Sequence, residues 1–360
     1  MTKIIFISFL ICIVPLFAVV CGPPQILQSE KIVKEINDDK KSTWKADTYG
    51  TKEINVEEFK QKYLGVILPF KYDKNKEMEK ELSQKEYGIL KAKEEKLPAY
   101  FNWAKTNKTN CPVGRIRDQS NCGSCWAVST ASAMQDRFCI QSGGKINVEL
   151  SSGYITACDQ SNYACRGGFM NRVYDFLKIN GTITGGDYDS DVGCQPYSIK
   201  PCGPFLDSHK MPCVYYLANN PKCRKKKCSN DWYKYQEEPE SSTYKYSRWS
   251  FIKGNISYTT EYLMRKEIYE NGPITAAFLI YSNFLYYKKG IYIPIRSWPM
   301  GGHAVKVVGW GEEDSVLYWI AQNSWSDRWG ENGFFRILRG TNAGYFESMV
   351  NEGKPDIKKS

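Results

Sequence analysis

The chain has 360 residues, with 49 Lys and Arg, 39 Asp and Glu and a formal net charge of +10. This length is enough for one large domain or for two smaller ones that share a core. The positive charge is mild and not concentrated, which argues against a nucleic-acid-binding protein.

Residues 1–21 have the pattern of a cleaved secretory signal peptide. Lys3 precedes an apolar run from Ile4 to Val20, and small residues follow near Ala18 to Gly22. An uncleaved membrane anchor is the alternative, since the run is just long enough to span a bilayer. We expect cleavage because the rest of the sequence has extracellular features and no later segment is apolar enough to span a membrane.

The number of cysteines indicates one free thiol. Of the 13 cysteines, Cys12 and Cys21 lie in or beside the signal peptide, and 13 minus these two leaves 11. Most cysteines pair in an oxidising compartment, and an odd number leaves at least one unpaired. We therefore expect five disulfides and one free cysteine.

Residues 22–96 differ in composition from the rest of the chain. They are rich in Lys, Glu and Asp, and they contain no Arg and no His. The stretches VEEFKQKYLG and KNKEMEKELSQKEYGILKAKEEK favour helix or disorder. Such a segment cannot build a disulfide-linked core, so we expect a propeptide that is removed near Leu97. A flexible interaction tail is the alternative.

From Leu97 onward, the pattern predicts an α+β fold in which a helical half precedes a strand-rich half. The segment Cys125–Ile140 has few helix breakers and apolar residues near helical spacing. The later stretches HAVKVVGWG, VLYWIAQNSW and GFFRILRG alternate β-branched and aromatic residues between glycine-rich turns, which predicts strands.

A cysteine-rich excursion separates these halves. We expect a long irregular loop pinned by disulfides over about 194–228, and loops of this kind are usually functional or mobile. Its basic run PKCRKKKC indicates a solvated loop, with an anionic surface or glycan partner as the alternative. Candidate glycosylation sites, which agree with secretion, are Asn107, Asn180 and Asn255.

Two cysteines, Cys122 and Cys125, stand three residues apart in SNCGSCWAVS. A redox pair, half of a metal site, a structural bridge and a nucleophile are the alternatives. Only two histidines, His209 and His303, occur in the chain, and disulfides would consume the thiolates of an all-cysteine zinc site. We therefore expect no metal and no cofactor.

Cys125 has the surroundings that a nucleophilic thiol needs. It opens the predicted helix, whose positive end favours the thiolate. The Gln119 amide and the Cys125 backbone N–H can donate to an oxyanion. His303 follows two glycines that allow a substrate backbone to approach, although a structural histidine is the alternative. Asn323 can orient the imidazole, shielded by Trp325.

Three segments together resemble the active-site blocks of papain-like cysteine proteases: DQSNCGSCWA, GGHAVKVVGWG and NSWSDRWGENGFFRILRG. Order, spacing and flanking residues match, over about Leu97 to Pro355, with a weaker propeptide match around STWKA. Within the family the chain resembles cathepsin B most, through LPAYFNW and through CQPYSIKPC, which leads into an insertion placed like its occluding loop. Residues Tyr318 to Glu347 also resemble the haemoglobin-degrading cathepsin B group of blood-feeding worms.

The resemblance implies a two-lobed peptidase from residue 97 to residue 360, with a helical lobe, a β-barrel-like lobe and an active-site cleft between them. Cys125 would be the nucleophile, His303 the base and acid, Asn323 the orienting residue and Gln119 the oxyanion donor. Substrate would contact Gly167, Gly168, Ala304, Trp325 and Met349. The implied disulfides are Cys111–Cys139, Cys122–Cys165, Cys158–Cys223, Cys194–Cys228 and Cys202–Cys213. Cys125 then stays free, and CGSC is not a redox pair.

The sequence departs from cathepsin B in the occluding loop. That enzyme carries two adjacent histidines that bind a substrate's C-terminal carboxylate, but Gly203, Pro204 and Phe205 follow Cys202 here. Proline and phenylalanine side chains cannot bind a carboxylate. We therefore expect mainly internal cleavage, with dipeptide release through Lys210 or other loop residues as the alternative.

The pocket for the second residue before the cut also departs from the family. Met349 matches the floor position that is often acidic, and Glu347 lies two residues away, where it can point elsewhere. An apolar floor favours large apolar side chains over arginine, because burying an unpaired cation is costly.

The remaining expectations concern partners and location. We expect a monomeric zymogen that acts on protein or peptide substrates, haemoglobin among them, and that is inhibited by its own propeptide and by cystatin-like proteins. It would be secreted or reside in an acidic compartment, either the lysosome or the gut lumen. A non-catalytic binding protein on the same scaffold is the alternative from another class.

Overall fold

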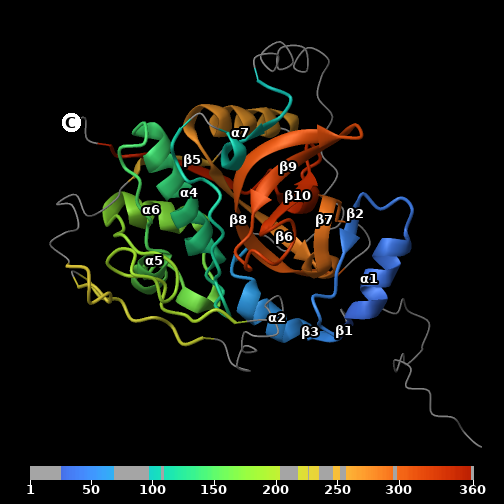
Figure 1. The fold of residues 1–360 in the computed structure, drawn as a ribbon, viewed down its shortest axis with the longest axis horizontal. Coiled ribbons are helices and arrows are strands. Elements are labelled where there is room, and N and C mark those ends of the chain that lie inside the picture. The colour runs from blue at the N-terminus through green and yellow to red at the C-terminus, as the bar shows by residue number, and fades with distance from the viewer. Residues whose placement is uncertain are drawn as a thin grey trace, which may run out of the picture.

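The computed structural model describes residues 26–68, 97–106, 109–202, 218–225, 227–234, 246–251, 257–294 and 298–357. Within these ranges, a group of helices and a large sheet lie side by side (Figure 1). The helical lobe contains α4 (Cys125–Gln141), α5 (Ser152–Cys158) and α6 (Met170–Ile179). This arrangement confirms the expected α+β fold with two lobes.

The second lobe is a nine-stranded sheet whose strands follow the order β2-β7-β10-β9-β8-β6-β11-β5, with β4 paired to β8. Its neighbouring strands run antiparallel except β10 and β7, which are parallel. The bounds are β2 Trp44–Ala46, β4 Phe101–Asn102, β5 Tyr246–Phe251, β6 Ile274–Tyr281, β7 Tyr287–Tyr292, β8 Pro299–Glu313, β9 Val316–Gln322, β10 Phe334–Leu338 and β11 Val350–Pro355.

Helix α7 (Ser257–Asn271) packs on this sheet against β8 and β6. Aromatic side chains fill the core beneath, where Phe278, Phe284 and Phe335 contact one another edge-on or stacked. The short 3₁₀ helices are η2 Trp103–Lys105, η3 Ala164–Arg166, η5 Ser282–Tyr286 and η6 Ala343–Tyr345.

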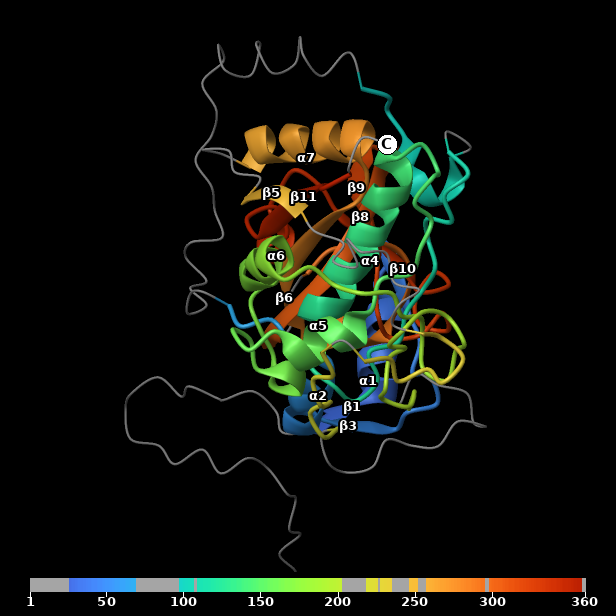
Figure 2. The ribbon, with the colours of Figure 1, turned by 90° about the vertical axis from the view of Figure 1, so that its left-hand side faces the viewer.

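Helix α4 joins the two lobes. Every side chain from Cys125 to Cys139 is buried, because α5 and α6 cover one side and β8, β6 and β11 the other. Figure 2 shows α4 behind α5 and α6, with β8 running beside it. A helix enclosed on all sides is held rigidly by packing, so its first residue has a fixed position between the lobes.

The described part of residues 22–96 is folded, with more strand than expected. VEEFKQKYLG contains the helix α2 (Val56–Tyr63), and a second helix, α1 (Ser29–Asp38), precedes it. The strands β1 (Ile26–Gln28) and β3 (Glu53–Asn55) pair with each other, while β2 joins the edge of the main sheet. The expectation of helix or disorder missed these strands; KNKEMEKELSQKEYGILKAKEEK lies outside the described residues.

Residues 1–21, for which a signal peptide is predicted, also lie outside the described residues. Within the described ranges, no helix combines the length and the apolar character that crossing a membrane requires.

Candidate active site

The free thiol lies where the sequence places it. Helix α4 begins at Cys125, which is completely buried, and Cys125 is the free cysteine of the described chain. Cys122, three residues earlier, is bonded to Cys165. The pair in CGSC is therefore one bridge cysteine and one thiol.

Four disulfides of the described chain have the pairing that the family resemblance implies. They are Cys111–Cys139, Cys122–Cys165, Cys158–Cys223 and Cys194–Cys228. Cys202 is also disulfide-bonded, and its expected partner, Cys213, lies outside the described residues. The same holds for Gly203, Pro204, Phe205, His209 and Lys210.

His303 and Asn323 form a hydrogen-bonded pair on neighbouring elements. His303 Nε2 lies 2.7 Å from Asn323 Oδ1, and both residues are buried. The Trp325 ring lies over the imidazole, with 4.6 Å between the ring centroids. Strand β8 begins at Pro299, so His303 lies inside this strand and not at its start.

Gln119 connects the lobes at the site. Its Nε2 donates to the Cys122 carbonyl at 2.9 Å and to the Tyr63 carbonyl at 3.1 Å. Its Oε1 accepts a hydrogen bond of 2.7 Å from Ser324 Oγ. Because Oε1 is occupied by a donor, the amide must present its N–H groups toward the site. Sequence reasoning missed this role of Ser324, although the NSW motif contains it.

Residues after α2 pass between the two lobes as an extended segment. Val66 N–H donates to Gly302 at 3.0 Å, and Ile67 N–H donates to Gly168 at 3.0 Å. Gly168 N–H donates in return to the Gly65 carbonyl at 2.8 Å. The segment therefore pairs with backbone groups of both lobes, beside both Cys125 and His303.

Glycine is required where this segment lies closest. A Cβ atom at Gly302 would stand 2.4 Å from the Val66 carbonyl oxygen, and one at Gly167 would stand 2.9 Å from the Gly65 carbonyl oxygen. Gly167 also has a φ of +105°, which disfavours other residues. These glycines thus leave the backbone open to an extended chain.

Burial keeps both reactive groups neutral in this form. It raises the pKa of the Cys125 thiol to about 12, and backbone N–H groups of Ala304 and Gly65 beside the sulfur oppose this rise. Burial lowers the pKa of His303 to about 4, against the opposing effects of the hydrogen bond to Asn323 and of the nearby Tyr63 backbone. A neutral thiol is a poor nucleophile, so burial disfavours attack by Cys125 in this form.

An apolar cluster lies beside the thiol. It includes Ala304, Met170 and Met349, and Val66 and Leu68 of the extended segment pack against it. Glu347 is also buried, but its carboxylate accepts hydrogen bonds from Trp319 Nε1 at 2.9 Å and from the backbone of the loop before it. Its charge is therefore engaged away from this cluster.

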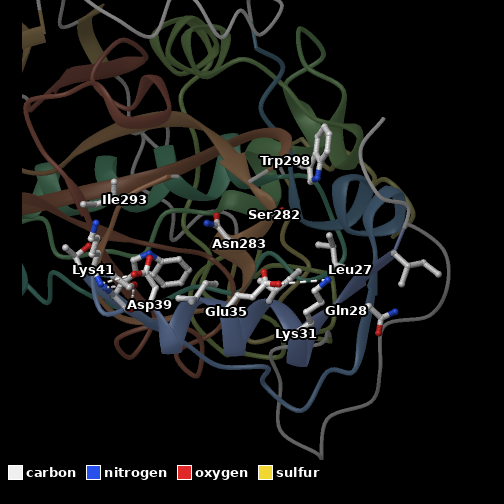
Figure 3. Close-up of a pocket in the computed structure, with 16 residues that line it drawn as sticks. Leu27, Gln28, Lys31, Glu35, Asp39, Lys41, Ser282, Asn283, Ile293 and Trp298 are labelled. Carbon is white, nitrogen blue, oxygen red and sulfur yellow. Dashed lines mark hydrogen bonds and ion pairs between the residues drawn. The ribbon is translucent and has the colours of Figure 1, made fainter. Parts of the chain in front are cut away.

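One large hollow of the described chain lies elsewhere. It is a groove of about 870 Å³ under α1, and none of the four predicted catalytic residues lines it. Figure 3 shows Glu35 and Asp39 along one wall and Asn283 and Trp298 along the other. The groove is therefore a junction between α1 and the β lobe and not the reactive centre.

The other predicted sites are on the surface or outside the described residues. Asn180 is exposed at the end of α6, whereas Asn107 and Asn255 lie outside the described residues. Described basic residues of PKCRKKKC are exposed. In the described ranges, His, Cys, Asp and Glu form no cluster of three or more suited to a metal ion.

Comparisons with known proteins agree with this geometry. The family model described as "Papain family cysteine protease" matches residues 97–353. "Cathepsin B-like cysteine proteinase 4" of Caenorhabditis elegans is 34% identical over 339 residues, which cover 93% of this chain and 95% of that protein. "Cathepsin B-like cysteine proteinase 1" of Ostertagia ostertagi is 37% identical over 307 residues, which cover 82% of each chain.

A solved structure of a proenzyme is also similar. The structure "proCathepsin B S9 from Trypanosoma congolense" has a TM-score of 0.68 and 28% identity, and the match covers 91% of this chain and 98% of that one. The chain belongs to the papain family of cysteine proteases, as a cathepsin B-like member. It is a cysteine peptidase with a propeptide.

Proposed function

We propose that the protein is a secreted or lysosomal cysteine endopeptidase, made as a zymogen, whose nucleophile is Cys125. The main supporting observation is that α4 begins at the free cysteine of the described chain, while His303 lies on the adjacent strand β8 and is hydrogen-bonded to Asn323. The alternative of a non-catalytic binding protein is weakened because these three residues are all present.

Acylation starts once the propeptide has left. Water then reaches the site, and the Cys125 thiol transfers its proton to His303, which forms a thiolate–imidazolium pair favoured by the start of α4. The thiolate attacks the scissile carbonyl carbon. Gln119 Nε2 and the Cys125 backbone N–H donate to the oxyanion that forms. His303 gives its proton to the leaving amine, and a thioester remains on Cys125.

Deacylation uses the same groups, with water as the nucleophile. His303 accepts a proton from water as the water attacks the thioester carbon, and the same two donors stabilise the second oxyanion. Collapse of the second tetrahedral intermediate breaks the bond between its carbon and the Cys125 sulfur. This step releases the carboxylic acid product and regenerates the free Cys125 side chain. Asn323 Oδ1 keeps the imidazole in one orientation throughout, and the Trp325 ring shields this hydrogen bond from solvent.

The propeptide of residues 22–96 inhibits by occupying these groups. The Tyr63 carbonyl accepts from Gln119 Nε2, the proposed oxyanion donor. Val66 and Ile67 use the backbone positions at Gly302 and Gly168 that would bind a substrate. We propose that the mature enzyme begins near Leu97, which agrees with the start of the family match at residue 97.

The apolar cluster supports a preference for large apolar side chains two residues before the cut. Val66 and Leu68 pack against the cluster that contains Ala304 and Met349, so an apolar side chain is already accepted there. An arginine would find no free carboxylate at this floor, because the oxygens of Glu347 are occupied.

Internal cleavage follows from the sequence of the loop after Cys202, where Gly203, Pro204 and Phe205 provide no cation. The second candidate, dipeptide release, would depend on Lys210 or His209. We further propose haemoglobin-like proteins as substrates, cystatin-like proteins as inhibitors, a monomeric enzyme and an acidic compartment, all in keeping with the family resemblance.

Paired peptides with a free and an amidated C-terminus separate the two candidates. An endopeptidase cleaves both at similar rates, whereas dipeptide release requires the free carboxylate. A strong preference for the free acid, lost in Lys210→Ala or His209→Ala, would overturn the proposal of internal cleavage.

A further inference from the structure

A small cavity is lined in part by Asn323, the partner of His303. It has a volume of about 10 Å³, close to the room that one water molecule needs. Residues of α4, of β8 and of the segments that carry Arg117 and Asn323 line it. The cavity therefore lies at the junction of the two lobes, within the core.

Four polar atoms from four lining residues have no hydrogen-bond partner among the described residues. These atoms are Arg117 Nε, Ser132 Oγ, Gln322 Oε1 and Asn323 Nδ2. The four residues are between 2% and 4% exposed. Buried polar groups are nearly always paired with protein or with ordered water, so four unpaired groups among the residues that line one cavity indicate a polar occupant.

The chemistry of the four atoms selects the occupant. Gln322 Nε2 donates to the Arg115 carbonyl, so the free Oε1 is an acceptor. Asn323 Oδ1 accepts from Ser324 N–H and pairs with His303, so the free Nδ2 is a donor. A water molecule can donate to Gln322 and accept from Asn323 at once. A halide ion only accepts, and it would leave Gln322 Oε1 unpaired.

We propose that this cavity holds an internal water molecule, and that Ser132 and Gln322 act through it as positioning residues for Asn323. The inference rests on the proposed role of Asn323. The two ends of an asparagine amide have nearly the same shape, and a flipped amide would point N–H groups at His303. A water that accepts from Nδ2 opposes this flip and keeps Oδ1 toward the imidazole.

A crystal structure of the Cys125→Ala zymogen at high resolution tests the water without any need for catalysis. We expect one ordered peak within hydrogen-bond distance of Gln322 Oε1 and Asn323 Nδ2. Crystals soaked in bromide distinguish the alternatives, because an anomalous peak would identify a halide. A dry cavity or a halide would overturn the proposal, even if the enzyme proves active.

Kinetics of the mature enzyme test the positioning role. Ser132→Val fills the cavity with methyl groups and excludes the water, whereas Ser132→Ala leaves room for it. We expect Ser132→Val to lower kcat/KM by roughly tenfold to a hundredfold. Ser132→Ala removes one contact of the water but leaves the water in place, so it should lower kcat/KM much less. Loss of the Asn323 contact also lowers the pKa of the imidazolium, so the alkaline limb of the pH profile should move toward acid in Ser132→Val.

Thr156→Val is the matched control, because it removes a buried hydroxyl that donates to the Ser152 carbonyl within α5. It should leave the pH profile unchanged. Gln322→Met provides a second variant should Ser132→Val fail to fold, and it should shift the same limb. An unshifted limb in a folded variant without the water would refute the positioning role. Inactivity of the parent enzyme would instead refute the proposed function.

Discussion

Gly65 of the propeptide lies directly against the thiol of Cys125. A Cβ atom at Gly65 would stand 2.1 Å from the Gly123 carbonyl oxygen and 3.0 Å from Cys125 Sγ. Only a residue without a side chain fits between these groups. The contact places the backbone of the propeptide at Gly65 over the nucleophile.

Replacing Gly65 should therefore weaken the block. In Gly65→Ala the new methyl group would collide with a backbone carbonyl that cannot move freely, so the segment must lift from Cys125. We expect faster alkylation of the zymogen thiol and earlier activation. Lys40→Ala is the control, because this side chain is exposed in the turn that follows α1. A Gly65→Ala zymogen as inert as the parent would show that the contact is unimportant.

The docking of α2 on Trp325 makes a second prediction. The Phe59 ring is 2% exposed and packs edge-on against Trp325 with centroids 5.6 Å apart. Phe59→Ala should weaken propeptide docking by roughly 3 kcal/mol and accelerate activation, measured by the appearance of the mature chain on gels. Glu57→Ala on the exposed side of α2 should leave the rate unchanged; equal rates in both variants would contradict the role of the ring.

The reactivity of the thiol should change when the propeptide leaves. In the zymogen, burial raises the pKa of Cys125 to about 12 and lowers that of His303 to about 4. Both groups are then neutral near neutral pH, and the thiolate is scarce. We expect iodoacetamide to modify Cys125 far more slowly in the zymogen than in the mature enzyme. Similar rates in the two forms would argue against the burial of the thiol.

The lowered pKa of His303 also predicts how the stability of the zymogen changes with pH. The pKa of buried His303 is about 4, below the ordinary value of 6.5. Above pH 6.5, His303 is neutral in both the folded and the unfolded chain, so the blocked form keeps its full stability. As the pH falls from 6.5 toward 4, the unfolded chain gains a proton that the folded chain does not, and the free energy of unfolding decreases. The Tm of the Cys125→Ala zymogen should therefore decrease over this pH range. His303→Asn, which cannot titrate, should show a smaller drop, and an identical drop would assign the effect to other groups.

The floor of the specificity pocket can be tested by adding a charge. Met349 is buried in the apolar cluster that accepts Val66 and Leu68. Met349→Glu should raise kcat/KM for arginine relative to phenylalanine, two residues before the cut, by roughly tenfold or more. Met349→Gln has a similar shape without the charge and should not. Efficient cleavage by the unchanged enzyme of substrates with arginine two residues before the cut would contradict the apolar assignment.

Glu347 should affect stability and not specificity. Its carboxylate accepts from Trp319 Nε1 and from the backbone N–H groups of Gly340 and Asn342. Glu347→Gln replaces one acceptor oxygen with a donor, which should destabilise the fold by about 2 kcal/mol. The ratio of kcat/KM for substrates with arginine to that for substrates with phenylalanine two residues before the cut should stay the same. A changed ratio would place Glu347 in the pocket.

Local sequence was sufficient for much of the site. The helix that begins at Cys125 and the strands around His303 and Asn323 follow from spacing of apolar residues over long stretches. The cysteine count required a free thiol, and the family resemblance assigned it. The enzyme class and the α+β fold predicted in this way are confirmed by the family match and by the structure.

The contacts between distant segments could not be predicted from the sequence. Strands β1, β2 and β3 are three residues each, too short for a period-2 pattern. β2 is a strand because Trp44 pairs with Gly290, which lies far along the chain. The Tyr63 carbonyl on Gln119 and the cavity behind Asn323 likewise depend on tertiary placement, which composition and periodicity do not encode.

The most direct test is mass spectrometry of the products that the matured enzyme forms from an unfolded protein, such as globin, at mildly acidic pH. Cys125→Ala, matured in the same way by an added protease and then separated from it, is the control. We predict internal fragments with the parent and none with Cys125→Ala. No fragments from the properly matured parent, or the same fragments from the variant, would contradict the assignment of Cys125 as the nucleophile.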